Sequence, residues 1–217
     1  MGNTSTGVIL LHGLALIRLS MLPLAVALRQ HGYLVVNVGY PSRKHPIESL
    51  AHSVIPPAIA ELRSNGVDTI HFVTHSMGGI LLRCFLATES LPEPGRAVML
   101  CPPNQGSELV DYFRRFWWFR WYFGPAGCQL GTAATDLPLG LGPFPRPVGI
   151  LTGNRPATGL FSRFFPGPND GKVSVARAQL QGMTDFLTLP YGHFSVMIHR
   201  PVAEQVIAFL ENGSFRR

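Results

Sequence analysis

Charged residues are scarce in this chain of 217 residues: Asp, Glu, Lys and Arg together make up 14% of it, whereas hydrophobic residues make up 46%. A disordered chain shows the opposite balance, so the composition predicts a packed core. The length suits one domain, and we expect residues 1–217 to form it. Acidic residues (12) are fewer than Lys and Arg together (18), and the resulting net charge of +6 favours contact with anionic surfaces.

Cysteine is also rare. The three cysteines, Cys84, Cys101 and Cys128, are an odd number and lack the spacing of a metal site. Cys84 and Cys101 lie in apolar segments, where we expect buried thiols. We therefore expect no metal and no cofactor. The cysteines suit a reducing compartment and a disulfide-free exported protein equally well.

A long uninterrupted hydrophobic run is missing as well. The most apolar stretch, residues 8–28, is broken by His12-Gly13, Arg18 and Pro23, and residues 1–6 contain no basic residue, which argues against a secretory signal. We expect a cytoplasmic protein, with peripheral contact at a membrane as an alternative and secretion left open. Residues 1–6 match a loose myristoylation pattern, but their polarity more simply predicts a flexible terminus.

The chain does contain a regular alternation of apolar, strand-like runs with helical patterns. Strands are expected near residues 8–11, 33–38, 70–73, 97–101, 148–152 and 186–189, and helices near residues 20–30, 47–63, 80–87 and 201–211. Pro56-Pro57 should divide the second helix in two or kink it. This alternation predicts an α/β fold in which helices cover both faces of a mostly parallel sheet, a three-layer α/β/α sandwich.

Residues 70–82 carry the strongest motif. An apolar run at residues 70–73 leads through Thr74-His75-Ser76-Met77-Gly78-Gly79 directly into an apolar helical run. This is the layout of a nucleophile elbow, in which a serine on a sharp strand-to-helix turn exposes its hydroxyl above the sheet. Gly78 and Gly79 are small enough for that close approach, whereas Thr74 stands where glycine is usual. A plain Ser-Gly turn is the simpler alternative.

Two later residues complete a catalytic set with Ser76. Asp170 lies in the loop that follows the expected strand at residues 148–152, and His193 follows the expected strand at residues 186–189. Functional loops of a parallel sheet gather at the carboxyl ends of its strands, so the three side chains should meet there. The order Ser76, Asp170, His193 is the order nucleophile, acid, base.

Other residues compete for these roles. Asn169-Asp170-Gly171 is a turn signal in its own right, and Asp111 and Asp136 are rival acids, although neither follows a strand. His199 is a rival base near the start of the last helix. His12 and His75 flank the site and are expected to hold loops through hydrogen bonds.

Five segments together resemble a known family. They are Leu10-Leu11-His12-Gly13-Leu14, Thr74-His75-Ser76-Met77-Gly78-Gly79, Pro103-Asn104-Gln105-Gly106-Ser107, Asn169-Asp170-Gly171-Lys172-Val173 and Gly192-His193. In this combination, and in the order nucleophile, acid, base, the chain resembles the small bacterial lipases and esterases of the α/β-hydrolase fold, which have no large cap domain. The resemblance implies a minimal sheet of about six strands.

The resemblance also implies an activity. Ser76 would attack a carboxylic ester and carry the acyl group, with His193 as general base and Asp170 orienting the histidine. The backbone N–H groups of Leu14 and Met77 would form the oxyanion hole; Met77 is also the first residue of the elbow helix, where N–H groups are unpaired. The expected function is that of a serine esterase or lipase. An acyltransferase or thioesterase with the same triad, and a non-catalytic lipid- or partner-binding module, are the alternatives.

Residues 109–123 contain nine aromatic residues, including all three tryptophans, interleaved with arginine. They belong to an insert, residues 104–146, that we expect to form an aromatic helix and loop near the active site. A core helix is one interpretation. The other is a partly exposed helix that contributes Phe113, Trp117 and Trp121 to a substrate pocket or touches a lipid interface. We expect no nucleic-acid partner, because the chain holds no other nucleic-acid module.

Overall fold

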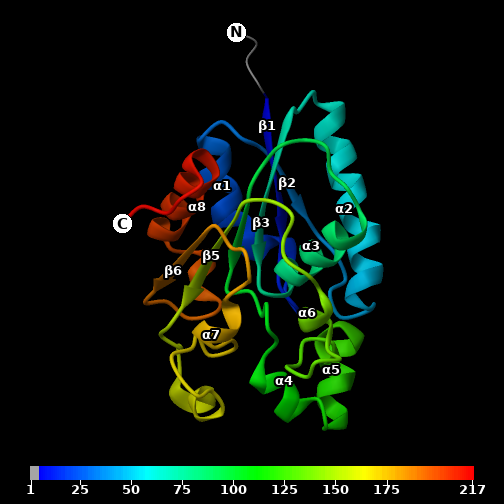
Figure 1. The fold of residues 1–217 in the computed structure, drawn as a ribbon, viewed down its shortest axis with the longest axis vertical. Helices are drawn as coiled ribbons and strands as arrows, with labels where there is room; N and C mark the ends of the chain where they lie inside the picture. The colour runs from blue at the N-terminus through cyan, green and yellow to red at the C-terminus, as the bar shows by residue number, and fades with distance from the viewer. Residues whose placement is uncertain (1–4) are drawn as a thin grey trace.

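A computed structural model describes residues 5–217, so most of the polar terminus expected at residues 1–6 lies outside the described residues. Its centre is a sheet of six parallel strands in the order β2-β1-β3-β4-β5-β6 (Figure 1). The strands are β1 (Thr6–Leu11), β2 (Leu34–Val38), β3 (Thr69–His75), β4 (Ala97–Leu100), β5 (Val148–Gly153) and β6 (Asp185–Leu189). The expected number of strands and their parallel direction are confirmed.

Helices cover both faces of this sheet. The α-helices are α1 (Leu22–Gln30), α2 (Ile47–Ser64), α3 (Met77–Thr88), α4 (Glu108–Phe113), α5 (Trp117–Cys128), α6 (Leu137–Gly140), α7 (Val175–Ala178) and α8 (Arg200–Asn212). Three short 3-10 helices are η1 (Arg18–Met21), η2 (Gly159–Phe164) and η3 (Ser195–Met197). Among the described residues, no helix is both long and apolar enough to cross a bilayer.

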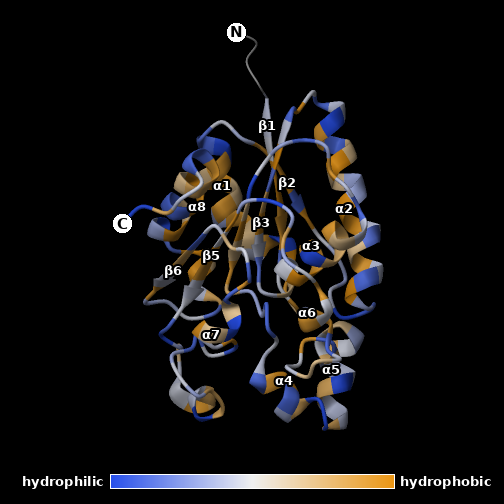
Figure 2. Cartoon of the chain, in the orientation of Figure 1, coloured by the Kyte–Doolittle hydropathy of each residue, from blue (hydrophilic) through white to orange (hydrophobic). Residues whose placement is uncertain are grey.

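The alternation of side chains along each strand creates two cores. Ile9 and Leu11 of β1 pack in one cluster with α2 and α3, whereas Val8 and Leu10 pack in the other with α1 and α8. Successive side chains of a strand point to opposite faces, so a continuous apolar strand needs a helical layer on each side. Figure 2 shows the resulting hydrophobic surfaces of the helices turned toward the sheet. The three-layer α/β/α sandwich is confirmed.

Helix α2 is a single helix that continues through Pro56 and Pro57, so of the two expected alternatives the division into two helices is wrong. Both prolines lie on the exposed side of the helix. The carbonyl groups that lose a backbone partner at a proline can there bond to water, which allows the helix to continue.

The aromatic segment forms two short helices, α4 and α5, rather than the single helix expected from the sequence. Helix α5 is itself kinked at Gly124, which has φ 65° and ψ −165°. A Cβ at this position would overlap the carbonyl oxygen of Arg43, so only glycine fits. The expected insert, residues 104–146, thus holds α4, α5 and α6 between β4 and β5, at the end of the molecule where the strands terminate (Figure 1).

Candidate active site

Ser76 occupies the turn between β3 and α3. Its backbone has φ 53° and ψ −124°, a conformation that a residue with a side chain rarely adopts. A backbone hydrogen bond holds this conformation, because Ser76 N–H donates to the Leu100 carbonyl at 2.8 Å. The next turn of chain is also close to β1: a Cβ at Gly78 would lie only 2.5 Å from the Leu11 carbonyl oxygen. The turn therefore needs glycine at position 78, where the start of α3 meets the end of β1.

Thr74, the residue that departs from the usual elbow pattern, is fully buried in β3. Its Oγ1 has no hydrogen-bond partner among residues 5–217. A Cβ at Gly79 would come 3.3 Å from this oxygen. The threonine is accommodated because the residue facing it across the turn is a glycine.

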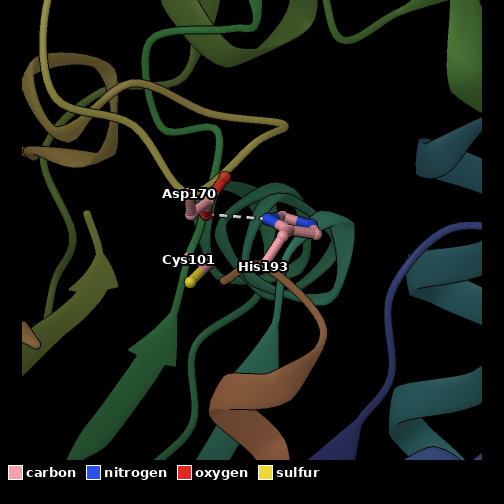
Figure 3. Close-up of side chains that lie close together, drawn as sticks. All are labelled: Cys101, Asp170 and His193. Atoms are coloured by element: carbon pink, nitrogen blue, oxygen red, sulfur yellow. Dashed lines mark hydrogen bonds and ion pairs between the residues drawn. The ribbon is translucent and has the colours of Figure 1, made fainter. Parts of the chain in front are cut away.

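The structure brings Ser76, His193 and Asp170 together although they are far apart in sequence. His193 Nε2 lies 3.0 Å from Ser76 Oγ. His193 Nδ1 lies 2.8 Å from Asp170 Oδ2, the contact drawn as a dashed line in Figure 3. The three residues are 9%, 6% and 2% exposed, respectively. Each imidazole nitrogen of His193 thus has one hydrogen-bond partner, the arrangement that proton transfer from serine to histidine requires.

A tight loop fixes the Asp170 carboxylate. Its Oδ1 accepts hydrogen bonds from the backbone N–H groups of Lys172 and Val173, both at 2.8 Å. Burial alone raises the pKa of Asp170, but the facing His193 and these two N–H groups outweigh it and hold the pKa below its ordinary value. Asp170 is therefore both a turn residue and the acid that faces His193, because the turn at Asn169-Asp170-Gly171 positions its carboxylate.

The backbone of His193 is held at both ends. Its N–H donates to the Asp170 carbonyl at 2.9 Å, and its carbonyl accepts from His75 Nε2 at 2.8 Å. Burial lowers the pKa of His75 to about 3, so this ring stays neutral and donates through Nε2–H. His75 thus holds the loop that carries His193 through a hydrogen bond, as expected, although the two residues are 118 positions apart in the sequence.

The loop after β1 lies against the serine. A Cβ at Gly13 would come 3.1 Å from Ser76 Cβ, so this backbone borders the space above the hydroxyl. The ring of His12 stacks on Tyr40 with centroids 4.0 Å apart, and Tyr40 O–H donates to the His12 carbonyl. Burial lowers the pKa of His12, which favours a neutral ring. His12 is thus a loop-holding residue, as the sequence suggested.

The two residues expected to form an oxyanion hole, Leu14 and Met77, both lie close to Ser76: Leu14 lines the same pocket, and Met77 is the next residue of the chain. Within residues 5–217, no hydrogen bond uses Leu14 N–H, although the neighbouring Ala15 N–H is bonded to Ser42 Oγ at 3.0 Å. Met77 is the first residue of α3, where a helix leaves its N–H groups without intrahelical partners. Both positions suit an oxyanion hole.

A largely apolar pocket of about 480 Å³ opens beside Ser76 and His193. Its aromatic lining comes mostly from α4, α5 and η2: Phe113, Trp118, Phe119, Tyr122, Phe123, Phe161 and Phe194. Phe113 is among the residues that the sequence indicated. Trp117 and Trp121 are not brought to the pocket, since their side chains are 77% and 79% exposed.

This difference has a simple geometric cause. Residues 117 and 121 share one face of α5, and residues 118 and 122 share the face next to it, about 100° around the helix. Six of the seven residues from Trp117 to Phe123 are aromatic, so sequence periodicity does not distinguish the two faces. Phe161 was also missed, although the cluster Phe161, Phe164 and Phe165 in a Gly/Pro-rich loop was a usable signal.

The rival residues have other partners. Asp136 forms an ion pair with Arg114, and Asp111 accepts hydrogen bonds from Thr132 N–H and Oγ1–H at 3.0 and 2.6 Å. His199 stacks on Tyr191 with ring centroids 4.0 Å apart. None of these three reaches Ser76.

Cys101 lies next to the acid–base pair at the end of β4 (Figure 3), a neighbour that the sequence did not reveal. Its sulfur, an Asp170 oxygen and a His193 nitrogen all lie within 4.8 Å of one another, a set that could hold a metal ion. Burial, followed by the nearby Asp170 carboxylate, raises the pKa of the Cys101 thiol well above its ordinary value. A protonated thiol is a poor ligand, and an ion would have to replace the Asp170–His193 hydrogen bond. The donor set therefore fits an acid–base pair better than a metal site.

Comparisons with known proteins agree with this architecture. The mature lipase BlEst2 of Bacillus licheniformis is 20% identical with a TM-score of 0.67, covering 90% of this chain and 87% of that chain. A metagenomic carboxyl esterase, MGS0156, is 19% identical (TM-score 0.72; 97% and 77% covered), and an esterase of Thermogutta terrifontis is 15% identical (TM-score 0.61; 97% and 92% covered). No curated protein sequence matches the chain.

These structural likenesses, at 20% identity or less, show a common fold. The sequence comparison goes further, because a family model described as the alpha/beta hydrolase family matches residues 8–208, nearly the whole chain. The match includes every residue of the candidate site described above. The chain belongs to the alpha/beta hydrolase family.

Proposed function

We propose that this protein is a serine hydrolase that cleaves carboxylic esters through an acyl-enzyme on Ser76. The observation that carries the proposal is the hydrogen-bonded set Ser76–His193–Asp170 at the mouth of an apolar pocket. The lipase and esterase names of the structural neighbours support the choice of esters.

The first half of the reaction forms the acyl-enzyme. Ser76 Oγ attacks the ester carbonyl carbon while His193 Nε2 accepts the hydroxyl proton. Negative charge then develops on the carbonyl oxygen, and the N–H groups of Leu14 and Met77 stabilise it. The bond to the alcohol oxygen breaks as His193 returns the proton to the leaving alcohol.

The second half regenerates the serine. A water molecule loses a proton to His193 Nε2 and attacks the acyl carbon, and the released acid leaves Ser76 with its proton restored. Asp170 stays ionised throughout, holds Nδ1–H toward itself and stabilises the imidazolium that forms in each half. Its lowered pKa keeps it ionised at neutral pH.

The pocket indicates which esters are suitable. Aromatic side chains dominate its lining, so an acyl chain or alcohol of hydrocarbon character gains more from binding than a polar one. The volume of about 480 Å³ leaves room for more than an acetyl group. Turnover of nitrophenyl esters should therefore increase from acetate toward medium chains.

A fluorophosphonate probe tests the nucleophile directly. We expect covalent labelling of the natural protein at Ser76 and no labelling of Ser76→Ala, with nitrophenyl ester turnover lost in the same variant. Ser53→Ala, on the exposed side of α2, is the matched control and should label and turn over normally. Turnover retained by Ser76→Ala would refute the assignment. An unlabelled natural protein would favour the non-catalytic, lipid- or partner-binding alternative.

Acyl transfer is a second candidate, because the same triad serves it and an apolar pocket favours an organic acceptor over water. An alcohol or thiol added to the ester assay distinguishes the two reactions. If the acyl group goes mainly to the added acceptor at low concentration, the protein is a transferase; if it goes to water, hydrolysis is the reaction.

A further inference from the structure

Two tryptophans of α5 lie outside both the core and the pocket. Trp117 and Trp121 are 77% and 79% exposed and share one face of the helix, while Phe119 on the opposite side is buried. The neighbouring Phe116 and Tyr112 are 37% and 38% exposed. A group of large, exposed aromatic side chains on one surface indicates a site that contacts another protein or a membrane.

The same surface is positively charged. Arg115 and Arg120 are exposed, and none of the ion pairs formed within residues 5–217 uses either of them. Arg115 instead lies over the rings of Tyr112 and Phe116, 4.1 and 5.0 Å from their centroids. The sequence contains no acidic residue from 112 to 135 to offset this charge.

This surface adjoins the pocket. Trp118 and Tyr122, on the next face of α5, line the pocket, and so does Phe113 of α4. Phe113 in turn contacts Phe161 of η2, with centroids 5.9 Å apart. Helices α4 and α5 lie at the end of the molecule where the strands terminate, the end that carries Ser76 (Figure 1).

We propose that the α4–α5 surface, formed by Tyr112, Arg115, Phe116, Trp117, Arg120 and Trp121, docks on an anionic phospholipid bilayer. Trp and Tyr side chains prefer the boundary between headgroups and acyl chains, and arginine pairs with anionic headgroups. Docked in this way, the pocket takes its ester from the lipid phase. That last step rests on the proposed esterase function, whereas the docking does not.

The charge favours a bilayer over a second copy of the chain. In a two-fold symmetric dimer the same patch meets itself, so Arg115 and Arg120 of one copy would approach those of the other. None of the six residues that form the surface is acidic, so no carboxylate among them separates these like charges. An anionic bilayer offers the opposite charge over the whole patch.

Sedimentation with vesicles tests the docking. The Ser76→Ala variant, which consumes no lipid, should bind vesicles of equal parts phosphatidylcholine and phosphatidylglycerol more tightly than vesicles of phosphatidylcholine alone. Tryptophan emission should shift to the blue on binding, because all three tryptophans are in α5. Adding Trp117→Ser and Trp121→Ser should weaken binding about tenfold or more.

Arginine variants separate specific docking from net charge. Arg115→Gln with Arg120→Gln should weaken binding to the anionic vesicles about fivefold per arginine. Arg216→Gln with Arg217→Gln removes the same charge at the C-terminus and should have a much smaller effect. Equal losses in both pairs, no vesicle binding at all, or a concentration-dependent dimer that the tryptophan substitutions abolish would overturn the proposal.

Activity measurements separate this inference from the proposed function. With Ser76 intact, Arg115→Gln with Arg120→Gln should leave turnover of a soluble nitrophenyl ester unchanged and lower turnover of the same ester type embedded in anionic vesicles. Vesicle binding without turnover of any ester would refute the esterase function and leave the docking standing. Turnover without vesicle binding would refute the docking and leave the esterase function standing.

Discussion

Replacing Asp170 by Asn preserves the shape of the side chain and changes which atoms can accept a hydrogen bond. In the natural protein, Oδ1 accepts two backbone N–H groups, from Lys172 and Val173, while Oδ2 accepts His193 Nδ1–H. The asparagine oxygen must take the Oδ1 position, because an NH₂ group there would leave buried donors unpaired at about 1–3 kcal/mol each. The NH₂ group therefore faces His193.

This orientation of the asparagine changes the tautomer of His193. His193 Nδ1, 2.8 Å from the new donor, must become an acceptor, so the ring proton moves to Nε2 and points at Ser76 Oγ. The ring can then no longer take the serine proton. We expect kcat for nitrophenyl butyrate to fall on the order of 10⁴-fold, equivalent to about 5 kcal/mol in the barrier.

Two measurements check this reasoning. Steady-state kinetics give kcat, and ¹⁵N NMR of the imidazole reports which nitrogen carries the proton. Asp136→Asn and Asp111→Asn are matched controls that should keep nearly full kcat, because the structure pairs both acids with residues remote from the serine. If Asp170→Asn retains more than about a tenth of the natural kcat, or if a control variant fails equally, the assignment of the acid is wrong.

Three further substitutions test other parts of the structure. Gly78→Ala should lower both the melting temperature and kcat, because its methyl group would lie 2.5 Å from the Leu11 carbonyl oxygen. Gly79→Ala should have a smaller effect in both assays, because its methyl group would meet only side-chain atoms, at 3.3 Å. Thr74→Val removes a buried hydroxyl without a partner and should stabilise the fold by about 1 kcal/mol in urea unfolding; clear destabilisation would mean that the hydroxyl is bonded. Burial, then the charge of a nearby arginine, lowers the pKa of His71 to about 4 from its ordinary 6.5. Below pH 6.5 the unfolded chain therefore binds a proton that the folded chain does not, and about 3 kcal/mol of stability should be lost as the pH falls to 4. His71→Asn should remove that part of the loss, and identical pH profiles of urea unfolding would contradict it.

Local sequence was sufficient for the fold and for the choice of Ser76, Asp170 and His193 as candidate site residues. Apolar runs of strand length, separated by helical patterns, determine a parallel sheet covered on both faces, because continuous strands such as β1 must be buried on both sides. The glycines after Ser76 and the turn residues around Asp170 reflect backbone constraints that act within a few positions. Such constraints are visible in a single chain.

Tertiary structure decided the features that depend on contacts between distant segments. Gly79 makes room for Thr74, the His75 ring supports the loop of His193, and Cys101 lies beside Asp170; none of these contacts follows from local spacing. The orientation of α5 was decided in the same way. Residues 117–123 are aromatic on nearly every side of the helix, so only packing against the rest of the chain determined that Trp118 faces the pocket and Trp117 faces outward.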